Sequence, residues 1–515
     1  MLKQTKVSRQ IKIFLLGVQR VSIIKHVFSY FQEVLLWLFI KFLRRYPEIQ
    51  SLYVTGSMAK GNYFFGTSDM DALAFLRPLS PENEYKAVSR IFRDTARLTA
   101  FFKIPKLERI FSQQDVKFVK ELSNHFFLIN PNAWRLVAGD SVNLDSVMRP
   151  LPRTALSGLF FRALWAHRLL VCDYLKANSL HRECLRDFYK NTFKICHILT
   201  DMNLVAEGHD IFRNNETFII ERVDDPLLKE ICKKSESIQS IDFFSKQGEE
   251  EISQACVRLF KWINAAAEKF FSMPNAEGPS SVCQNNIQMI SPKQLEYAHH
   301  LNRDVAGAIA AIICFNSQLL VIAKNTATLE DLKKLLQITK KNYLTPTNDS
   351  FNPESVNFWM QDSLKAFGSH DPFWYQAYLK SAQTLVGQAP WQLMSAIQPH
   401  KELIRKLYML NAMSEMKKGF SLRGIDLFKH QKRILNHLVV NRVLFETDII
   451  PSMDNGKEIY QQCFAGEPET SKIVQLLERD VFQKASNLKE SDEFSRDYYL
   501  CQRYLVDKLE PFVTG

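Results

Sequence analysis

The stretch Leu52–Phe75, LYVTGSMAKGNYFFGTSDMDALAF, contains two short apolar runs separated by a segment rich in small residues. Apolar runs of this length, bounded by Gly and Ser, indicate β-strands, which we expect over about 51–55 and 70–76. Side chains alternate along a strand, so Asp69 and Asp71 project from one face, roughly 6–7 Å apart. Adjacent carboxylates repel each other, and a cation between them relieves this repulsion. The stretch therefore predicts a cation site at the start of its second strand.

The turn between the two strands supplies a second part of the same site. Gly56 allows the backbone to approach a ligand closely, and the amides at the start of a helix over about 57–61 form an anion site. Lys60 lies in that short helix, and Ser68 directly precedes Asp69. Hard oxygen ligands hold Mg²⁺, and Mg²⁺ holds phosphates. The pattern therefore predicts a site for Mg²⁺ and a phosphorylated ligand.

Together, the two halves of the stretch resemble the polymerase-β-like nucleotidyltransferase superfamily, particularly its small bacterial members. The signature of that superfamily is an apolar strand, Gly-Ser, a spacer and Asp-x-Asp on the next strand. The matching segments here are Gly56–Gly61 and Thr67–Asp71, and residues 58–68 separate Ser57 from Asp69. Neither half alone is specific, but both occur here at the spacing of the superfamily and between two apolar runs.

The resemblance covers about the first 150 residues. It implies an α+β fold in which a small mixed-sheet catalytic domain, with N-terminal helices, occupies residues 1–150 and mostly α-helical domains follow. It also implies a Mg²⁺-dependent enzyme, with two ions, that moves a nucleoside monophosphate from a nucleoside triphosphate (NTP) to a hydroxyl acceptor and releases pyrophosphate. The implied contacts of the triphosphate are Gly56, Ser57, Lys60 and Ser68.

The superfamily's third metal carboxylate lies on the strand that follows the Asp-x-Asp strand. We expect that strand over about 108–119 and predict that Asp115 joins Asp69 and Asp71 in holding the metal, with Glu108 as the alternative. A polar Asp at the start of a strand could instead face solvent.

The acceptor is open. A small molecule or a protein side chain is our first hypothesis, and an RNA terminus is the alternative. The net charge of +11 permits contact with nucleic acid, but the chain has no tract of five or more basic residues and no recognisable RNA-binding module. A third hypothesis is a non-catalytic, nucleotide-binding or antitoxin-like protein that retains the fold. The sequence does not define the oligomeric state.

Beyond residue 150 the periodicity is mainly helical. We expect a helical bundle over 151–273 that forms the second wall of the cleft, a linker over 274–290, and a mostly helical region of unknown role over 291–515. One exception is a short apolar run at 318–323, which predicts a strand followed by a helix. Before the boundary, the segment Trp134–Asp140 resembles a helix that ends in a Gly-Asp turn.

His167 lies five residues after Arg162, a spacing found in one helical nuclease family, but a structural role explains this common pair better. The nine cysteines include no Cys-x-x-Cys pair, which favours free thiols in a reducing, cytoplasmic compartment. No segment predicts a membrane span, because the most apolar stretch, Val34–Ile40, is too short to cross a bilayer.

Overall fold

The chain divides into two compact units, the first made of Met1–Leu151 with Lys401–Gly515 and the second of Pro152–His400. The predicted region 291–515 is therefore divided between the two units, and the predicted linker over 274–290 lies outside the described residues. The computed structural model describes residues 22–55, 59, 70–102, 105–112, 115, 134–142, 152–177, 185–209, 216–236, 246–271, 292–315, 318–344, 356–370, 382–388, 412, 415–417, 419–422, 424–447, 449–453, 455–479 and 488–514.

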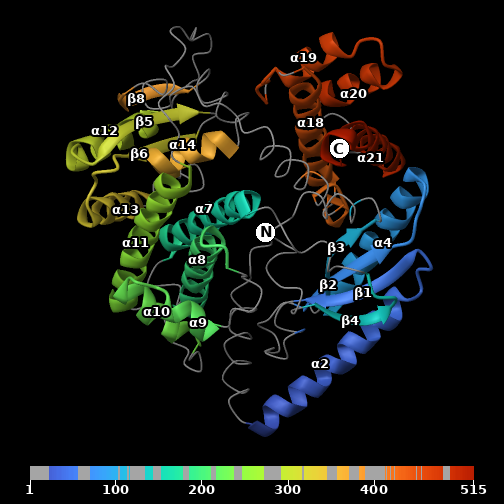
Figure 1. Ribbon diagram of the computed structural model, residues 1–515, viewed down its shortest axis with the longest axis horizontal. Helices are drawn as coiled ribbons and strands as arrows, with labels where there is room; N and C mark the ends of the chain where they lie inside the picture. The colour runs from blue at the N-terminus through green and yellow to red at the C-terminus, as the bar shows by residue number, and fades with distance from the viewer. Residues whose placement is uncertain are drawn as a thin grey trace. The chain divides into compact units, whose positions relative to one another are not determined.

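A four-stranded mixed sheet with the order β3-β2-β1-β4 forms the centre of the first unit (Figure 1). β1 pairs antiparallel with β2 and with β4, whereas β2 and β3 are parallel. The two strands predicted from the opening stretch are confirmed as β1 and β2. The segment predicted to form a helix at 134–140 is instead strand β4, so that prediction is wrong. The strands are β1 (Ile49–Thr55), β2 (Met70–Leu76), β3 (Pro105–Phe111) and β4 (Trp134–Gly139).

Helix α2 (Ser22–Leu43) precedes the sheet and packs against one face of it. Its Leu36 packs with Val54 of β1, and Ile40 lies beside this pair. The window His26–Leu43 is, by length and composition alone, apolar enough to cross a membrane, and it is longer than the apolar stretch that the sequence suggested. Core helices of soluble proteins and signal sequences meet the same criterion.

Helix α4 (Pro81–Phe102) connects β2 to β3 and also packs against the C-terminal part of the same unit. Tyr85 of α4 lies in a group of aromatic rings with Phe420 and Tyr499, whose centroids are 5.6–5.8 Å apart. The elements of this C-terminal part are η6 (Gly419–Ser421), α18 (Gly424–Thr447), α19 (Gly456–Cys463), α20 (Pro468–Glu478), α21 (Leu488–Leu509) and α22 (Pro511–Thr514).

The second unit contains the predicted helices and, in addition, a second four-stranded sheet (Figure 1). Its helices before the sheet are α7 (Pro152–Lys176), α8 (Leu185–Ala206), α9 (Glu216–Glu221), α10 (Pro226–Glu236) and α11 (Lys246–Phe271). The remaining elements are α12 (Pro292–Val305), β5 (Ile309–Phe315), β6 (Gln318–Ala323), α13 (Leu329–Leu344), β7 (Val356–Met360), α14 (Gln361–His370) and β8 (Gln383–Gly387).

The predicted strand at 318–323 and the helix after it are confirmed as β6 and α13. The other three strands of this sheet lie in sequence that we expected to be helical. All seven residues of β5 are buried, so its sequence is a continuous apolar run. A buried run of this kind has no alternating pattern, and periodicity cannot separate it from a buried helix.

Candidate active site

Asp71 is the second residue of β2 and is half-buried. The neighbouring Ala72 pairs with Val54, which faces α2. Because successive side chains of a strand point to opposite faces, Asp71 projects from the face that α2 leaves uncovered. The Thr55 hydroxyl donates to the backbone carbonyl of Asp71 over 3.5 Å, linking the end of β1 to the start of β2.

Aromatic rings cover the same face of the sheet farther along the strands. Tyr53 and Phe75 are in edge contact, with centroids 5.5 Å apart. Phe75 also stacks on Phe111 of β3 at 5.3 Å, and Trp134 of β4 lies 6.0 Å from Tyr53. These packed rings fix the sheet on which Asp71 lies, so the position of its carboxylate depends on a rigid core.

The parallel pairing of β2 with β3 determines which β3 residue lies near Asp71. Asp71 pairs with Lys106, and Ala72 pairs with Leu107. The register then shifts, so that Leu73 pairs with Arg109 and Glu108 is an extra residue on β3. Such bulges are common beside active sites, where they redirect a side chain. Glu108 therefore lies between Leu107 and Arg109 on β3, two residues after Lys106, which is the partner of Asp71.

Asp115 does not lie on this strand. β3 ends at Phe111, which pairs with Phe75, and Phe75 is four residues or roughly 13 Å along β2 from Asp71. Asp115 lies beyond that end of β3, so the two carboxylates are at opposite ends of the parallel strand pair. The prediction that the third strand brings Asp115 beside Asp71 is wrong, and Asp69 lies outside the described residues.

The Asp115 side chain instead completes a helix capping box. Its Oδ2 accepts hydrogen bonds from the backbone amide of Ser112 over 2.6 Å and from the Ser112 hydroxyl over 2.9 Å. In return, the Asp115 amide donates to the Ser112 hydroxyl oxygen over 3.3 Å. This reciprocal pattern is typical of a Ser-x-x-Asp sequence at the start of a helix, and it is the local signal that the strand interpretation overlooked.

A buried ionic cluster also holds Asp115. The Lys417 ammonium donates to Asp115 Oδ2 and lies 2.5 Å from Glu84 Oε1. Arg503 approaches the other Glu84 oxygen at 3.9 Å, and the Tyr499 hydroxyl donates to Glu84 over 2.7 Å. Burial raises the pKa of Glu84, but the two cations and these hydrogen bonds outweigh burial and lower it overall. The cluster joins α4 and the end of β3 to the C-terminal part of the unit.

The remaining predicted site residues lie outside the described part of the chain. They are Gly56, Ser57, Lys60, Ser68 and Asp69. Among the side chains that the structure describes, no group of three His, Cys, Asp or Glu residues is arranged to hold a metal ion. The side chain of Glu108 is likewise outside that set.

His167 has a structural environment in the second unit. Its Nε2 lies 2.8 Å from the Cys256 carbonyl oxygen, and its ring stacks on Phe260 with centroids 5.3 Å apart. Because a carbonyl only accepts, Nε2 carries the proton of the neutral ring. Burial lowers the pKa of His167 to about 4. The ring is therefore a neutral core residue, as the structural interpretation of the Arg162–His167 spacing predicts.

Comparison with known protein families identifies the first sheet. Residues 37–135 match the family described as nucleotidyltransferase domain, a segment that runs from α2 to the start of β4. This part of the chain is a nucleotidyltransferase domain of the polymerase-β-like type, within an α+β fold whose remainder is mostly helical. Neither a search of curated proteins nor a search of solved structures returned a match.

Proposed function

We propose that this protein is a Mg²⁺-dependent nucleotidyltransferase that moves a nucleoside monophosphate from an NTP to a hydroxyl-bearing acceptor. The acceptor oxygen loses its proton and bonds to the α-phosphorus, the bond between the α-phosphorus and its bridging oxygen breaks, and pyrophosphate leaves. The observation that carries the proposal is Asp71 at the start of β2, in a matched nucleotidyltransferase domain and on the face that α2 leaves uncovered.

The carboxylates of the proposed site suit a hard divalent cation, which prefers oxygen ligands. Asp71 is the second residue of β2, Asp69 precedes it by two residues in the sequence, and Glu108 is the bulged residue of the adjacent parallel strand. We assign the third carboxylate to Glu108 rather than to Asp115, because Asp115 is held by Ser112 and Lys417 at the other end of β3. Bound Mg²⁺ would neutralise phosphate charge and lower the pKa of the acceptor hydroxyl.

The segment between β1 and β2 is proposed to hold the triphosphate. Gly56 permits close approach of the backbone, and Ser57 with the adjacent amides would donate hydrogen bonds to the β- and γ-phosphates. Lys60 and Ser68 are secondary contacts in this proposal. Ala59, the described helical residue of this segment, packs beside Leu36 and Val54. This contact supports a short helix that begins directly after β1.

A small molecule or a protein side chain is the proposed acceptor class, and an RNA terminus is the alternative. A cytoplasmic location is proposed from the cysteines. The seven described cysteines are present as thiols, and five of them are buried: Cys196, Cys232, Cys256, Cys314 and Cys501. Buried thiols without disulfides suit a reducing compartment.

The test supplies the full-length protein with Mg²⁺, each of the four NTPs labelled at the α-phosphate, and cell lysate separated into protein, RNA and small-molecule fractions. Label is expected in the protein or small-molecule fraction, and label in RNA would instead support the alternative. Asp71→Asn should abolish transfer without changing the melting temperature. Asp140→Asn is the matched control, because Asp140 is exposed and follows the opposite end of the sheet.

Full activity of Asp71→Asn would refute the metal assignment. Absence of both transfer and NTP binding in the wild-type protein would favour a non-catalytic protein that retains the fold.

A further inference from the structure

The second sheet repeats the topology of the first. Its order is β7-β6-β5-β8, and the order of the first is β3-β2-β1-β4. In each sheet the first two strands along the chain are antiparallel, the third is parallel to the second, and the fourth is antiparallel to the first. β5, β6, β7 and β8 therefore correspond in chain order to β1, β2, β3 and β4.

Two of the three irregularities of the pairing recur at the same places, whereas the shift between β2 and β3 has no counterpart between β6 and β7. The β1–β2 register shifts between Ile49 and Ser51, and the β5–β6 register shifts between Ile309 and Ala311. The β1–β4 register shifts directly after Leu52, and the β5–β8 register directly after Ile312. Each shift in the second sheet therefore lies at the corresponding strand residue. Two arbitrary sheets with the same strand order would not share these positions.

A glycine in left-handed conformation ends the fourth strand of both sheets. Gly139 has φ +83° and pairs with Ser51, and Gly387 has φ +79° and pairs with Ala311. A Cβ on Gly139 would lie 1.9 Å from the Gln50 carbonyl oxygen, and a Cβ on Gly387 would lie 2.3 Å from the carbonyl oxygen of Ala310. Only glycine fits such a position, where the backbone of the neighbouring strand approaches closely.

The helices around the strands also correspond. A helix precedes the first strand of each sheet, and a crossover helix joins the second strand to the third. Both crossover helices start after a hydroxyl residue whose oxygen accepts an amide hydrogen bond, Ser80 for α4 and Thr328 for α13. After the third strand, the Asp115 side chain accepts from the Ser112 amide, and Ser363 Oγ accepts from the Met360 amide.

The second sheet has no counterpart of the catalytic loop. Residues 56–69, with the Gly-Ser turn and Asp69, lie between β1 and β2, whereas only Asn316 and Ser317 lie between β5 and β6. A connection of two residues is a hairpin turn, too short to contain a helix N-terminus that binds phosphates.

The carboxylate of β2 is also replaced. Ser51 pairs with Phe75 and the corresponding Ala311 with Ile322, so that the position of Asp71, four residues earlier than Phe75, is Gln318 in β6. The Gln318 amide oxygen accepts a hydrogen bond from Asn357 of β7 over 3.1 Å. This amide pair is neutral, and neutral amides lack the charge with which carboxylates hold Mg²⁺.

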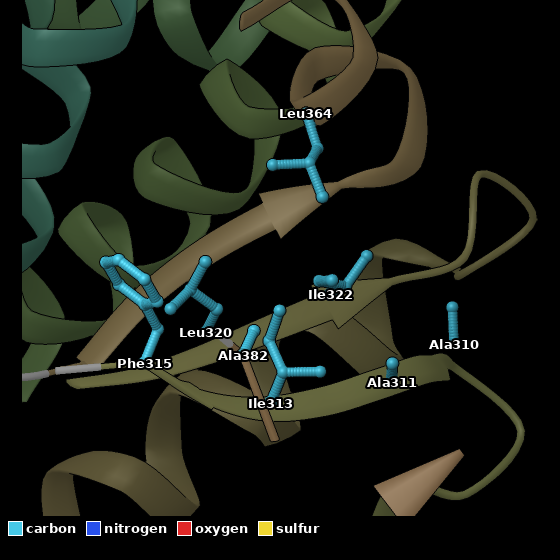
Figure 2. Close-up of a cluster of buried hydrophobic side chains, with 8 residues drawn as sticks. All are labelled: Ala310, Ala311, Ile313, Phe315, Leu320, Ile322, Leu364 and Ala382. Carbon is cyan, nitrogen blue, oxygen red and sulfur yellow. The ribbon is translucent and has the colours of Figure 1, made fainter. Parts of the chain in front are cut away.

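Apolar side chains fill the face that corresponds to the Asp71 face (Figure 2). Ile313, Phe315, Leu320 and Ile322 come from β5 and β6, and Leu364 comes from α14. All five are at most 2% exposed, and Trp359 and Phe367 pack beside them. The corresponding residues of the first sheet, Tyr53, Leu73 and Phe75, are also buried, so this apolar packing is a feature that the two sheets share.

We infer that residues 292–388 form a second nucleotidyltransferase-type domain that is catalytically inactive, so that the chain contains two such folds and one nucleotide site. The second fold retains the strand order, two of the three register shifts and the surrounding helices, and it lacks the loop of residues 56–69 and a carboxylate at the position of Asp71.

The test is the number of nucleotide molecules bound by the full-length chain. Calorimetric titration with Mn²⁺ and the non-hydrolysable analogue of each NTP should give at most one molecule per chain. Binding should weaken at least tenfold in Asp71→Asn and stay unchanged in Gln318→Ala. Hydrogen–deuterium exchange of the wild-type protein adds a readout that needs no variant. Nucleotide should protect amides of 49–76 and leave those of 309–323 unchanged.

Two bound molecules, or binding that survives Asp71→Asn and is lost in Gln318→Ala, would overturn the inference, as would nucleotide-dependent protection of 309–323. Absence of any binding would contradict the proposed function but would agree with an inactive second fold, so the two failures are distinguishable.

Discussion

Lys417 and Glu84 form a buried ion pair, with Nζ 2.5 Å from Oε1 and both side chains 2% exposed. Glu84 lies near the start of α4 in the nucleotidyltransferase domain, and Lys417 belongs to the C-terminal part of the same unit. Asp115 and Arg503 contribute a second carboxylate and a second cation to this cluster. The four charges balance, so removal of any one of them leaves an uncompensated charge in the core.

Lys417→Met is therefore expected to lower the free energy of unfolding by about 3–5 kcal/mol. Urea denaturation followed by circular dichroism measures this change. The matched control is Lys472→Met, because Lys472 pairs with Asp497 over 2.7 Å at the surface and is 48% exposed. Exposed pairs contribute about 0–1 kcal/mol. Equal losses in the free energy of unfolding would contradict this expectation, because the buried cluster would then contribute no more than an exposed ion pair.

Glu108→Gln and Asp115→Asn should have different effects. If Glu108 is a metal ligand, the amide variant loses at least about 100-fold in transfer rate at an unchanged melting temperature. Asp115→Asn removes one of the two carboxylate partners of Lys417 and should lower the melting temperature while the folded protein stays active. Rates per folded molecule and thermal unfolding measure both effects. Loss of activity in a stable Asp115→Asn protein would restore Asp115 as the metal ligand.

The second unit should lose stability in acid because His167 is buried as the neutral ring. Its pKa is lowered by burial from 6.5 to about 4, so the unfolded chain binds a proton at a pH where the folded chain does not. The stabilisation is complete above pH 6.5 and is lost as the pH falls toward 4, by about 3 kcal/mol in all. His167→Gln should remove part of this pH dependence.

Thermal unfolding between pH 7 and 4 tests this expectation. His209→Gln is the control, because His209 is exposed in the same unit. An identical pH profile of the wild-type and His167→Gln proteins would contradict it.

Gly387→Ala should destabilise the second unit more than Gly208→Ala does. Both glycines have φ near +80°, a conformation that costs an L-residue about 1–2 kcal/mol. A Cβ on Gly208 meets nothing within 4 Å, whereas a Cβ on Gly387 overlaps the Ala310 carbonyl oxygen. We expect an additional loss of about 1–3 kcal/mol for Gly387→Ala, measured by urea denaturation. Equal losses in the free energy of unfolding would contradict this expectation and would show that β5 and β8 shift to accommodate the added Cβ without a further cost.

Local patterns in the sequence were sufficient for several elements. The stretch Leu52–Phe75 predicted β1 and β2, because the apolar runs of strands and the Gly and Ser residues that end them are properties of neighbouring residues. The same reasoning predicted the unit of β6 and α13. It failed for β4, whose six residues have no alternating burial, and for the wholly buried β5.

The sequence by itself determined the class of domain, because Gly-Ser and Asp-x-Asp, at this spacing between two apolar runs, are the signature of nucleotidyltransferase domains. Only the tertiary structure separated Asp115 from Asp71, because the parallel pairing of β2 with β3 places Asp71 at the start of the strand pair and Asp115 beyond its end. It alone revealed the second fold as well. The likeness of the two sheets consists of strand order, register and a close backbone approach at Gly139 in the first sheet and at Gly387 in the second. Many different side chains are compatible with these backbone features, so the sequence pattern does not show them.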